Sequence, residues 1–189
     1  MNRRPLIAVI GDASVKEDPE KYNLAEQLGY ALVSNGYRVA CGGLGGIMKA
    51  VCQGARRSKE YKEGDTIGIL PGHNPDEANE YVDIVIATGL DHARNIIIAN
   101  SDAVIAIGGG SGTLSEISIA WALDRLILAY EVDGWSGKIA GQRIDHRIRY
   151  QDIPDDKVYG IKSEKEVIVL LETILPKYNR RHTRIVRRC

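Results

Sequence analysis

The 189-residue chain has no phenylalanine and only 6% aromatic residues, so its core has to be built from aliphatic side chains. It has no apolar run near the ~18–20 residues that a membrane-spanning helix requires. The apolar stretch 6–10 is too short for the hydrophobic region of a secretory signal. With 44% hydrophobic and 26% charged residues, the chain has enough apolar side chains for one ordinary folded domain.

Cysteine is also scarce, with Cys41, Cys52 and Cys189 scattered along the chain and no CxxC spacing. Such a set argues against a disulfide framework or a zinc site and favours a reducing cytoplasm. We expect Cys41 and Cys52 to be small buried apolar residues. The four histidines also lack the spacing of metal ligands, so no metal site is expected. They are His73, His92, His146 and His182.

Excess charge of either sign is missing, because 25 basic residues balance 25 acidic ones. This balance argues against a strongly basic nucleic-acid-binding protein. Residues 177–189 nevertheless hold six Lys and Arg and no acid. We expect residues 1–176 to form one folded domain and 177–189 a mobile basic tail. A solvated extension is the favoured role of that tail over contact with a nucleic acid or an acidic partner.

What the sequence does contain is a regular alternation of short apolar runs and longer helical patterns. The predicted strands are Leu6–Ile10, Tyr37–Cys41, Thr66–Leu70, Val82–Thr88, Ala103–Ile107, Leu126–Tyr130 and a short Val158–Gly160. The predicted helices are Pro19–Asn35, Ile47–Arg57, Asp91–Asn100, Thr113–Leu123 and Ser163–Leu175, with a glycine-rich loop at Gly134–Gly141. Continuous apolar strands that alternate with helices predict an α/β fold, a single doubly wound parallel sheet of the Rossmann-like type with helices on both faces.

Glycines cluster directly after two of these strands, at 42–46 and at 108–112, and each cluster opens a helix. The carboxyl ends of parallel strands form the edge where ligands bind, and a helix N-terminus there attracts phosphate. The turn after the first strand lies at the same edge. The alternative is that the glycines serve only tight turns and helix packing. The ligand-binding candidates are Gly11, Ser14, Gly42, Gly43, Gly46, Met48, Gly108, Gly109, Gly110, Ser111, Gly112 and Thr113.

Two standard phosphate motifs can be tested against these clusters. Neither cluster has the GxxxxGK[ST] pattern of a Walker A loop. The dinucleotide fingerprint fits partly, because Gly110-x-Gly112-x-x-Ser115 is followed by Glu131, where a ribose-binding acid would stand. That turn follows the fifth strand rather than the first. A nicotinamide or flavin enzyme therefore remains an alternative.

Three charged residues lie near the glycine clusters. The spacing of Thr113 and Glu116 fits a capping box, in which the glutamate only caps its helix. Alternatively, the Glu116 carboxylate lies at the phosphate site and steadies a developing cation. The Arg94 guanidinium can donate two parallel hydrogen bonds to a phosphate. The simpler alternative is that Arg94 lies on a solvated face of its helix. Asp91 is the predicted N-cap of the helix that carries Arg94, and His92 lines the site or lies on the surface.

Several motifs together resemble the LOG-like family, whose members are often labelled "lysine decarboxylase-like". The chain has a GGxxGxM loop at 42–48, an arginine at 94 before the segment 101–103, and a loop–helix at 108–116 similar to PGGxGTxxE. The resemblance covers roughly residues 5–135. It implies a Rossmann-like nucleotide-binding fold for the domain expected over residues 1–176 and self-association as a dimer or larger homo-oligomer. The scattered cysteines and the short apolar runs separately favour a cytoplasmic protein without a membrane contact.

In the enzymes of that family, the resemblance implies hydrolysis of the N-glycosidic bond of nucleoside 5′-monophosphates, which releases ribose 5-phosphate and requires no cofactor. Arg94 and Glu116 match the catalytic pair of the family. The residues that match its phosphate loop are Gly109, Gly110, Gly112 and Thr113. No pattern indicates a pyridoxal-binding lysine, so decarboxylation is not expected.

Two positions depart from the enzyme pattern, since Gly108 replaces the proline of PGGxGT and Asn95 replaces a lysine. The GGGxGTxxE form is similar to a sister branch that includes the molybdenum cofactor carrier proteins, which hold a pterin phosphate without converting it. Two functions thus remain open. One is a phosphoribohydrolase acting on an AMP-like nucleotide. The other is a carrier or sensor of a phosphorylated ligand such as molybdenum cofactor.

Overall fold

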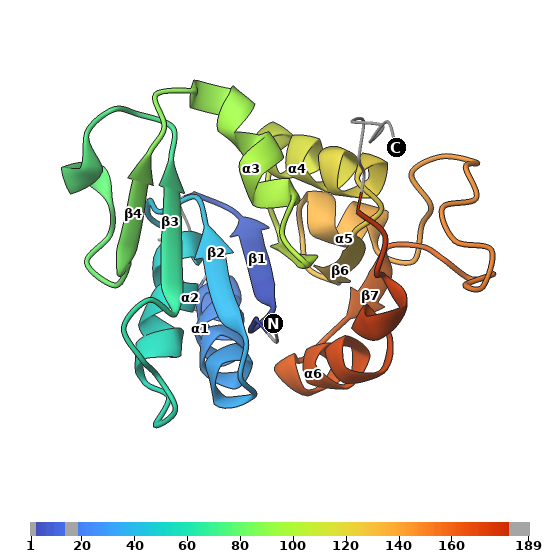
Figure 1. Ribbon diagram of the computed structural model, residues 1–189, viewed down its shortest axis with the longest axis horizontal. Coiled ribbons are helices and arrows are strands. Elements are labelled where there is room, and N and C mark those ends of the chain that lie inside the picture. The colour runs from blue at the N-terminus through green and yellow to red at the C-terminus, as the bar shows by residue number, and fades with distance from the viewer. Residues whose placement is uncertain (1–2, 14–18, 182–189) are drawn as a thin grey trace, which may run out of the picture.

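The computed structural model describes residues 3–13 and 19–181 (Figure 1). Within these residues, seven strands form one sheet in the order β4-β3-β2-β1-β5-β6-β7, and every neighbouring pair is parallel. The strands are β1 (Leu6–Gly11), β2 (Arg38–Cys41), β3 (Thr66–Leu70), β4 (Ile84–Ala87), β5 (Ala103–Ile107), β6 (Leu126–Tyr130) and β7 (Tyr159–Ile161). The predicted Rossmann-like α/β fold is confirmed.

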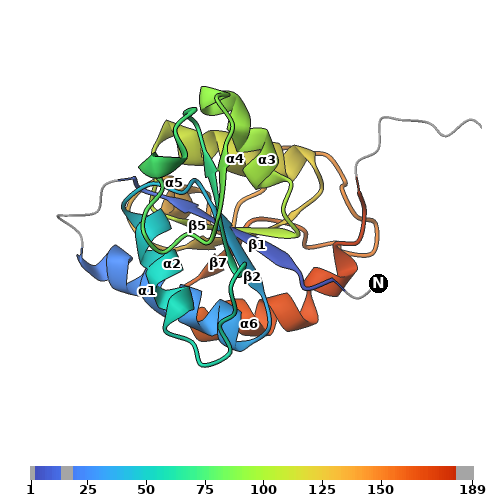
Figure 2. The same ribbon diagram turned by 60° about the vertical axis from the view of Figure 1, so that its left-hand side comes forward.

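Helices cover both faces of this sheet, as Figure 2 shows with α3 and α4 on one side and α1 and α6 on the other. The α-helices are α1 (Pro19–Ser34), α2 (Ile47–Arg56), α3 (Asn95–Ala99), α4 (Ser111–Ala122), α5 (Trp135–Ile139) and α6 (Glu164–Thr173). Three 3₁₀ helices are η1 (Pro75–Glu77), η2 (Asp91–Arg94) and η3 (Leu175–Lys177). Because side chains alternate along a strand, Ile7 and Val9 of β1 pack toward α1 and α2, whereas Ala8 and Ile10 pack toward α3 and α4. None of the described helices has the length and apolarity that a membrane crossing needs.

The predicted helix Asp91–Asn100 is divided into η2 and the short α3. The predicted N-cap role of Asp91 is wrong, because Leu90 holds that position and no side chain caps the helix. Asp91 itself has a φ of 48°, outside the extended conformation from which a cap side chain reaches the helix amides. By contrast, Ser163 caps α6 as its spacing with Glu166 predicts, accepting a hydrogen bond from the Glu166 amide at 3.4 Å.

Helix α5 lies where the sequence predicts only a glycine-rich loop. Its first residues are tied to the loop after β5, since the Trp135 amide donates to the Gly109 carbonyl at 2.9 Å and the Ser136 amide to the Gly108 carbonyl at 3.0 Å. These hydrogen bonds join segments that are far apart in the sequence. The local glycine pattern at 134–141 therefore does not predict this helix.

The two described cysteines are buried apolar residues, as expected. Cys41 at the end of β2 and Cys52 on α2 are both fully buried, and their Sγ atoms lie 3.6 Å apart. Both cysteines lie in the core between β2 and α2, where small apolar side chains pack.

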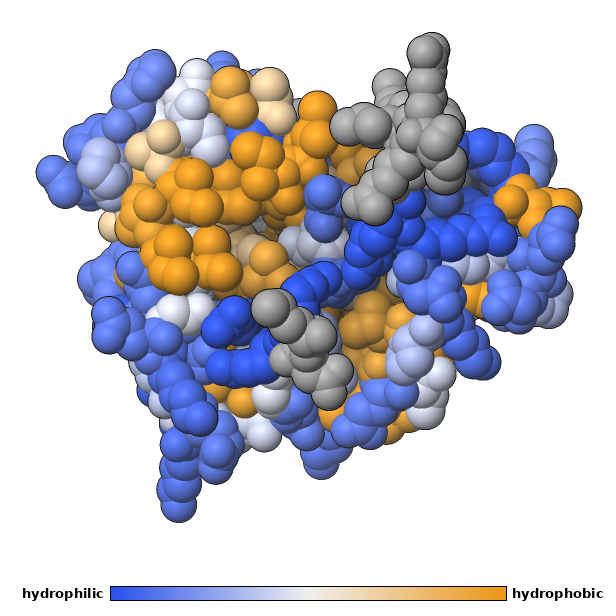
Figure 3. All heavy atoms as spheres, in the orientation of Figure 1, coloured by the Kyte–Doolittle hydropathy of each residue, from blue (hydrophilic) through white to orange (hydrophobic). Residues whose placement is uncertain are grey.

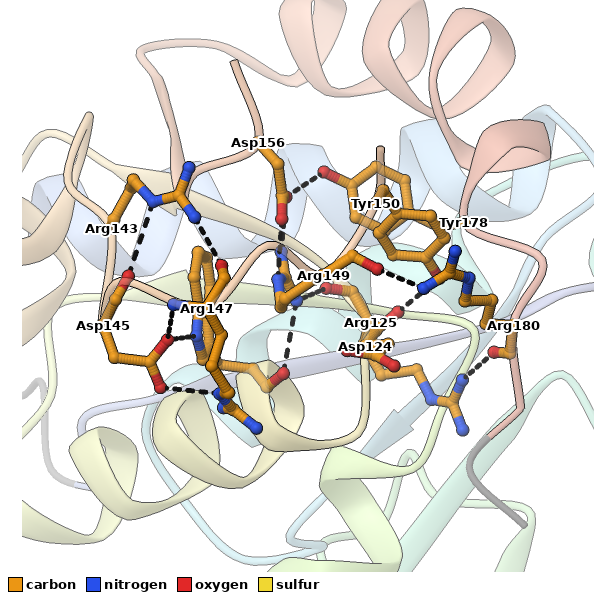
Figure 4. A network of polar contacts seen from close by, with 11 residues as sticks. Asp124, Arg125, Arg143, Asp145, Arg147, Arg149, Tyr150, Asp156, Tyr178 and Arg180 are labelled. Atoms are coloured by element: carbon orange, nitrogen blue, oxygen red, sulfur yellow. Dashed lines mark hydrogen bonds and ion pairs between the residues drawn. The ribbon is translucent and has the colours of Figure 1, made fainter. Parts of the chain in front are cut away.

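Residues 177–181, the first part of the predicted tail, pack against the body of the protein (Figure 4). The Tyr178 hydroxyl donates to Asp156 at 2.6 Å, and Asp156 accepts two hydrogen bonds from the buried guanidinium of Arg149, at 2.8 and 2.6 Å. The guanidinium carbon of Arg149 lies 3.6 Å from the ring centre of Trp121. Residues 182–189 lie outside the described part of the chain.

Candidate functional site

A cavity of about 280 Å³ opens at the carboxyl ends of the central strands. The chain runs outward from β1 through β2, β3 and β4, then returns to β5 on the other side of β1. The carboxyl side of this reversal of strand order is the place where α/β sheets bind ligands. The cavity is lined by Ile10, Gly11, Asp12, Ala13, Gly42, Leu44, Met48, His92, Arg94, Asn95, Gly110, Ser111, Gly112, Thr113 and Glu116.

Most of the residues that the sequence singled out meet in this lining. They come from four separate segments of the chain and are Gly11, Gly42, Met48, Arg94, Gly110, Ser111, Gly112, Thr113 and Glu116. The remaining candidates with described coordinates are absent from the lining: Gly43, Gly46, Gly108 and Gly109. Ser14 lies outside the described residues. His92, whose role was open, lines the cavity.

The glycines behind the cavity wall hold the surrounding loops in place. Gly46 precedes α2 with a φ of 61°, and a side chain there would collide with the backbone of Asp12 and Ala13. The Ile47 amide donates to the Asp12 carbonyl at 3.0 Å, which joins α2 to the turn after β1. Gly108 donates its amide to the Ser136 hydroxyl at 2.7 Å. These contacts fix the two glycine-rich turns relative to β1.

The N-terminus of α4 provides backbone N–H groups at the cavity. The helix begins at Ser111 after the N-cap Gly110, and no side chain caps it. The first intrahelical bond of the α4 start runs from the Leu114 amide to the Gly110 carbonyl at 3.0 Å. The preceding N–H groups, those of residues 110–113, therefore have no partner within the helix. All four of these residues line the cavity, at the end of α4 where the helix dipole is positive.

This helix start excludes the capping box. Thr113 lies in the first turn of α4 rather than at the N-cap, so Glu116 is too far along the helix to reach back to the N-cap amide. Glu116 instead lines the cavity, and the residue is only 7% exposed. Burial raises the pKa of Glu116 to about 7, and the positive charge of Arg94 acts in the opposite direction.

Arg94 reaches the cavity from the end of η2. One of its terminal nitrogens donates to the Ile69 carbonyl at 2.9 Å, while its Nε is buried and has no hydrogen-bond partner among the described residues. Burial lowers the pKa of Arg94, and the negative charge of Glu116 opposes that shift. A side chain at position 42 would stand within 3 Å of the Arg94 guanidinium and the Met48 sulfur, so both side chains would have to move to make room for it.

The sequence reasoning did not select Asp12, Leu44 or Asn95. Asp12 follows β1, and its carboxylate pairs with the Lys21 ammonium at 3.2 Å. Asn95 is buried and donates from Nδ2 to the Ser115 hydroxyl at 2.8 Å, which links α3 to α4. Asp12 had a usable signal, because it stands at the carboxyl end of the first strand, like the chosen glycines.

Glu131, the acid that a dinucleotide site would place on a ribose, is not part of the lining. Its carboxylate lies beside Gly160 of β7 and pairs with Lys162 at 3.4 Å. This placement gives no support to the nicotinamide or flavin alternative.

Comparison with known proteins agrees with this architecture. A solved molybdenum cofactor binding protein of Rippkaea orientalis is 32% identical, covers 93% of this chain and 99% of its own, and superposes with a TM-score of 0.76. The molybdenum cofactor carrier protein MCP of Chlamydomonas reinhardtii is 25% identical, with coverage of 92% and 99% and a TM-score of 0.72.

An uncharacterised protein of Archaeoglobus fulgidus is 44% identical over 115 residues, which are 60% of this chain and 72% of that protein. The model of the SLOG cluster4 family matches residues 4–168, which include every described residue of the cavity lining. The resemblance to LOG-like proteins, in the branch similar to molybdenum cofactor carriers, is thereby confirmed. The chain belongs to the SLOG cluster4 family.

Proposed function

We propose that this protein binds a phosphorylated small molecule in the cavity between β1 and β5 and acts as a carrier of a pterin phosphate of the molybdenum cofactor type. The observation that carries the proposal is the row of unpaired N–H groups at residues 110–113, which lines the cavity at the reversal of strand order. Unpaired amides at a helix N-terminus bind phosphate through hydrogen bonds and the helix dipole.

Other groups of the cavity suit the rest of such a ligand. Arg94 keeps donors that are not used by Ile69, and its planar fork matches a phosphate oxygen pair. Asp12 and Glu116 supply carboxyl groups, which accept hydrogen bonds from the ring N–H and amino groups of a pterin. The solved relatives named for molybdenum cofactor binding support this ligand class.

The anion site can be tested by placing a carboxylate at the start of α4. A side chain at Gly112 meets open space, so Gly112→Asp can fold with its carboxylate where a phosphate would lie. Lys165→Asp is the matched control, because it places the same residue at the second position of α6, away from the cavity. Each protein is purified from a host that makes molybdenum cofactor, and molybdenum content and pterin fluorescence are measured.

Wild type and Lys165→Asp are expected to retain pterin and molybdenum, and Gly112→Asp is expected to lose both. Equal retention by Gly112→Asp would contradict the phosphate site. An empty wild-type protein from that host would contradict the carrier.

The second candidate is a phosphoribohydrolase, favoured by the meeting of Arg94 and Glu116 in one cavity. In that reaction an ionised Glu116 steadies the ribosyl cation that forms as the glycosidic bond breaks. With a pKa of about 7, Glu116 is ionised in only about half of the molecules at neutral pH. This candidate predicts that AMP releases ribose 5-phosphate, and that Glu116→Ala abolishes release but not AMP binding.

A further inference from the structure

The Glu116 carboxyl group lies at the cavity without a hydrogen-bond partner. Glu116 is 7% exposed, and no hydrogen bond or ion pair of its carboxyl group occurs among the described residues. The Arg94 guanidinium acts on this group only through its charge. Buried carboxyl groups are normally hydrogen-bonded or paired, because burial removes them from water. An unpaired carboxyl group in a cavity wall therefore points to a ligand atom as its partner.

The helix geometry brings Glu116 close to the proposed anion. Glu116 and Gly112 both line the cavity and lie four positions apart on α4. Residues at this spacing share one face of a helix, and helical side chains lean toward the N-terminus. The Glu116 side chain therefore extends toward the N–H groups of residues 110–113, where a phosphate would bind. An ionised Glu116 would then stand beside the negative charge of the ligand.

The positive charge at the cavity is too small for two ionised partners. Among the described residues of the lining, Arg94 is the one arginine or lysine, and Asp12 is already paired with Lys21. Arg94 and the dipole of α4 together supply about one and a half positive charges. A phosphate dianion and an ionised Glu116 bring three negative charges. One of these charges is therefore left without compensation.

The elements packed around Glu116 add no further cation at the cavity. The sequences of β1, α3, β5 and β6 contain no charged residue. Lys138 of α5 lies over the ring of Trp135 and is absent from the described lining. The titratable and charged groups that face Glu116 or Arg94 are Asp12, Cys41, Asp91 and His92.

The outer flank of the segment that carries Arg94 is apolar. The stretches 84–90 and 95–101 contain no charged residue. Figure 3 shows the resulting hydrophobic surface over β4, β3 and α3. Its exposed side chains are Ile84, Ile86, Leu90, Ile96 and Ile97. This flank therefore does not offset a second negative charge in the cavity.

We propose that the protein takes up one proton when its ligand binds, and that Glu116 holds this proton. The carboxylate accepts the proton from the solvent as the phosphate enters, and its O–H then donates a hydrogen bond to a phosphate oxygen. Hydrogen bonds from an O–H to an ionised oxygen are short and strong. The carbonyl oxygen of the neutral carboxyl group remains an acceptor for a ring N–H or amino group of a pterin. This role of Glu116 rests on the proposed function, which places the phosphate at residues 110–113.

The free protein is already close to this protonation state. Burial raises the pKa of Glu116 to about 7, so about half of the molecules carry the proton at neutral pH. A bound anion raises the pKa of Glu116 further, because it disfavours an ionised carboxylate beside it. A neutral Glu116 has no charge with which to stabilise a ribosyl cation. The same proton therefore suits a protein that holds its ligand without cleaving it.

Sulfate is the probe for this role, because it is a dianion that holds no proton between pH 6 and 8. Any proton taken up is then bound by the protein. The amide signals of residues 110–113 in nitrogen-15 NMR report sulfate binding to the full-length protein. Wild type is expected to bind sulfate about fivefold or more weakly at pH 8 than at pH 6, because an ionised Glu116 must first be protonated.

Two glutamine variants assign this pH dependence. Glu116→Gln keeps the shape of the side chain but cannot ionise, so its affinity for sulfate is expected to change by less than about twofold between the two pH values. Glu166→Gln is the matched control on the exposed start of α6 and is expected to behave like wild type.

A second measurement uses wild type alone and does not depend on the folding of a variant. Carbon-13 NMR follows the titration of the Glu116 carboxyl group with and without saturating sulfate. An anion that prefers the protonated protein raises the pKa of the group that holds the proton, since the two equilibria are linked. Sulfate is therefore expected to raise the pKa of Glu116.

The possible failures of the role of Glu116 and of the anion site differ. Equal sulfate affinity at both pH values, or an unchanged pKa of Glu116 with sulfate bound, would overturn the role of Glu116 and leave the anion site in place. A pH dependence that persists in Glu116→Gln would also overturn it and assign the proton to His92, because histidine titrates in the same range. Amide signals of residues 110–113 that do not respond to sulfate at either pH would contradict the anion site itself, and with it the role of Glu116.

Discussion

The carboxylate of Asp12 occupies the space into which a side chain on Gly108 would project. Lys21 holds that carboxylate at 3.2 Å, and Gly108 has a φ of 64°. Proline requires a φ near −65°, so the proline of the PGGxGT pattern cannot stand here without changing the turn. The departure from that pattern at position 108 therefore agrees with the positive φ of the turn after β5.

Gly108→Ala is expected to lower the free energy of unfolding by about 2 kcal/mol, because an L side chain is strained at this φ and meets Asp12. Urea unfolding followed by circular dichroism measures the loss. Gly112→Ala is the control, since a side chain there meets open space. In an Asp12→Gly background the cost of Gly108→Ala should shrink but not vanish. An unchanged cost would show that Asp12 plays no part.

Glu116→Gln is expected to stabilise the protein above neutral pH. Burial raises the pKa of Glu116 from 4.5 in the unfolded chain to about 7 in the folded one. Stability linked to this group is full below pH 4.5 and is lost as pH rises through about 7. The loss amounts to about 3 kcal/mol at pH 8.

The measurement is urea unfolding of wild type and Glu116→Gln at a series of pH values from 5 to 8. The difference in stability should grow with pH in favour of Glu116→Gln, which removes the charge but keeps the shape. Parallel curves would mean that the pKa of Glu116 is not raised. Glu166→Gln, on the exposed start of α6, is the control.

For the phosphoribohydrolase candidate, Arg94→Lys is expected to weaken AMP binding about tenfold or more, since lysine keeps the charge but loses the planar fork. Isothermal calorimetry with AMP checks this, with Arg57→Lys as the control, because Arg57 pairs with Glu26 outside the cavity. Unchanged AMP binding in Arg94→Lys would show that the Arg94 guanidinium does not bind the phosphate.

Arg94→Met is expected to raise the pKa of Glu116 further. The arginine charge is the one influence that the structure gives as lowering this pKa, so its removal leaves burial unopposed. Carbon-13 NMR of labelled glutamate follows the titration, with assignment by Glu116→Gln. A pKa that falls in Arg94→Met would contradict the proximity of the two charges.

Asp156→Ala is expected to cost about 3–5 kcal/mol of stability, because it leaves the buried Arg149 guanidinium without its carboxylate. Tyr178→Phe removes one hydrogen bond to Asp156 and should cost about 1 kcal/mol. A chain ended after residue 176 should lose at least as much as Tyr178→Phe. Full stability of that shortened chain would show that the segment 177–181 is dispensable for the fold.

The strands of the sheet are predictable because each is a continuous apolar run between turn residues, as in Ala103–Ile107 and Leu126–Tyr130. The division of the helix after β4 was not predictable, since it depends on Asp91, whose amide donates to the Pro71 carbonyl at 3.0 Å. Helix α5 was missed for a similar reason. Its start is tied to the carbonyls of Gly108 and Gly109, far away in the sequence.

For the site, the positions of glycine after β2 and β5 pointed to the edge of the sheet at which the cavity opens, because parallel strands place their carboxyl ends together. The glycine positions did not show which glycines line the cavity and which only hold the loop behind it. Gly110 and Gly112 line the cavity, whereas Gly108 and Gly109 hold the loop behind it. Arg94 and Glu116 were placed in one site through the family resemblance and not through their own local patterns.

The sequence by itself determined the local features: apolar strands, helix periods, glycine turns and the charge balance. These follow from backbone geometry and side-chain polarity over a few residues. Only the tertiary structure decided that Glu116 is buried beside Arg94, that Asp12 fills the space at Gly108, and that β3 and β4 keep an uncovered apolar face. Burial and proximity depend on segments distant in the chain, so no window of the sequence contains them.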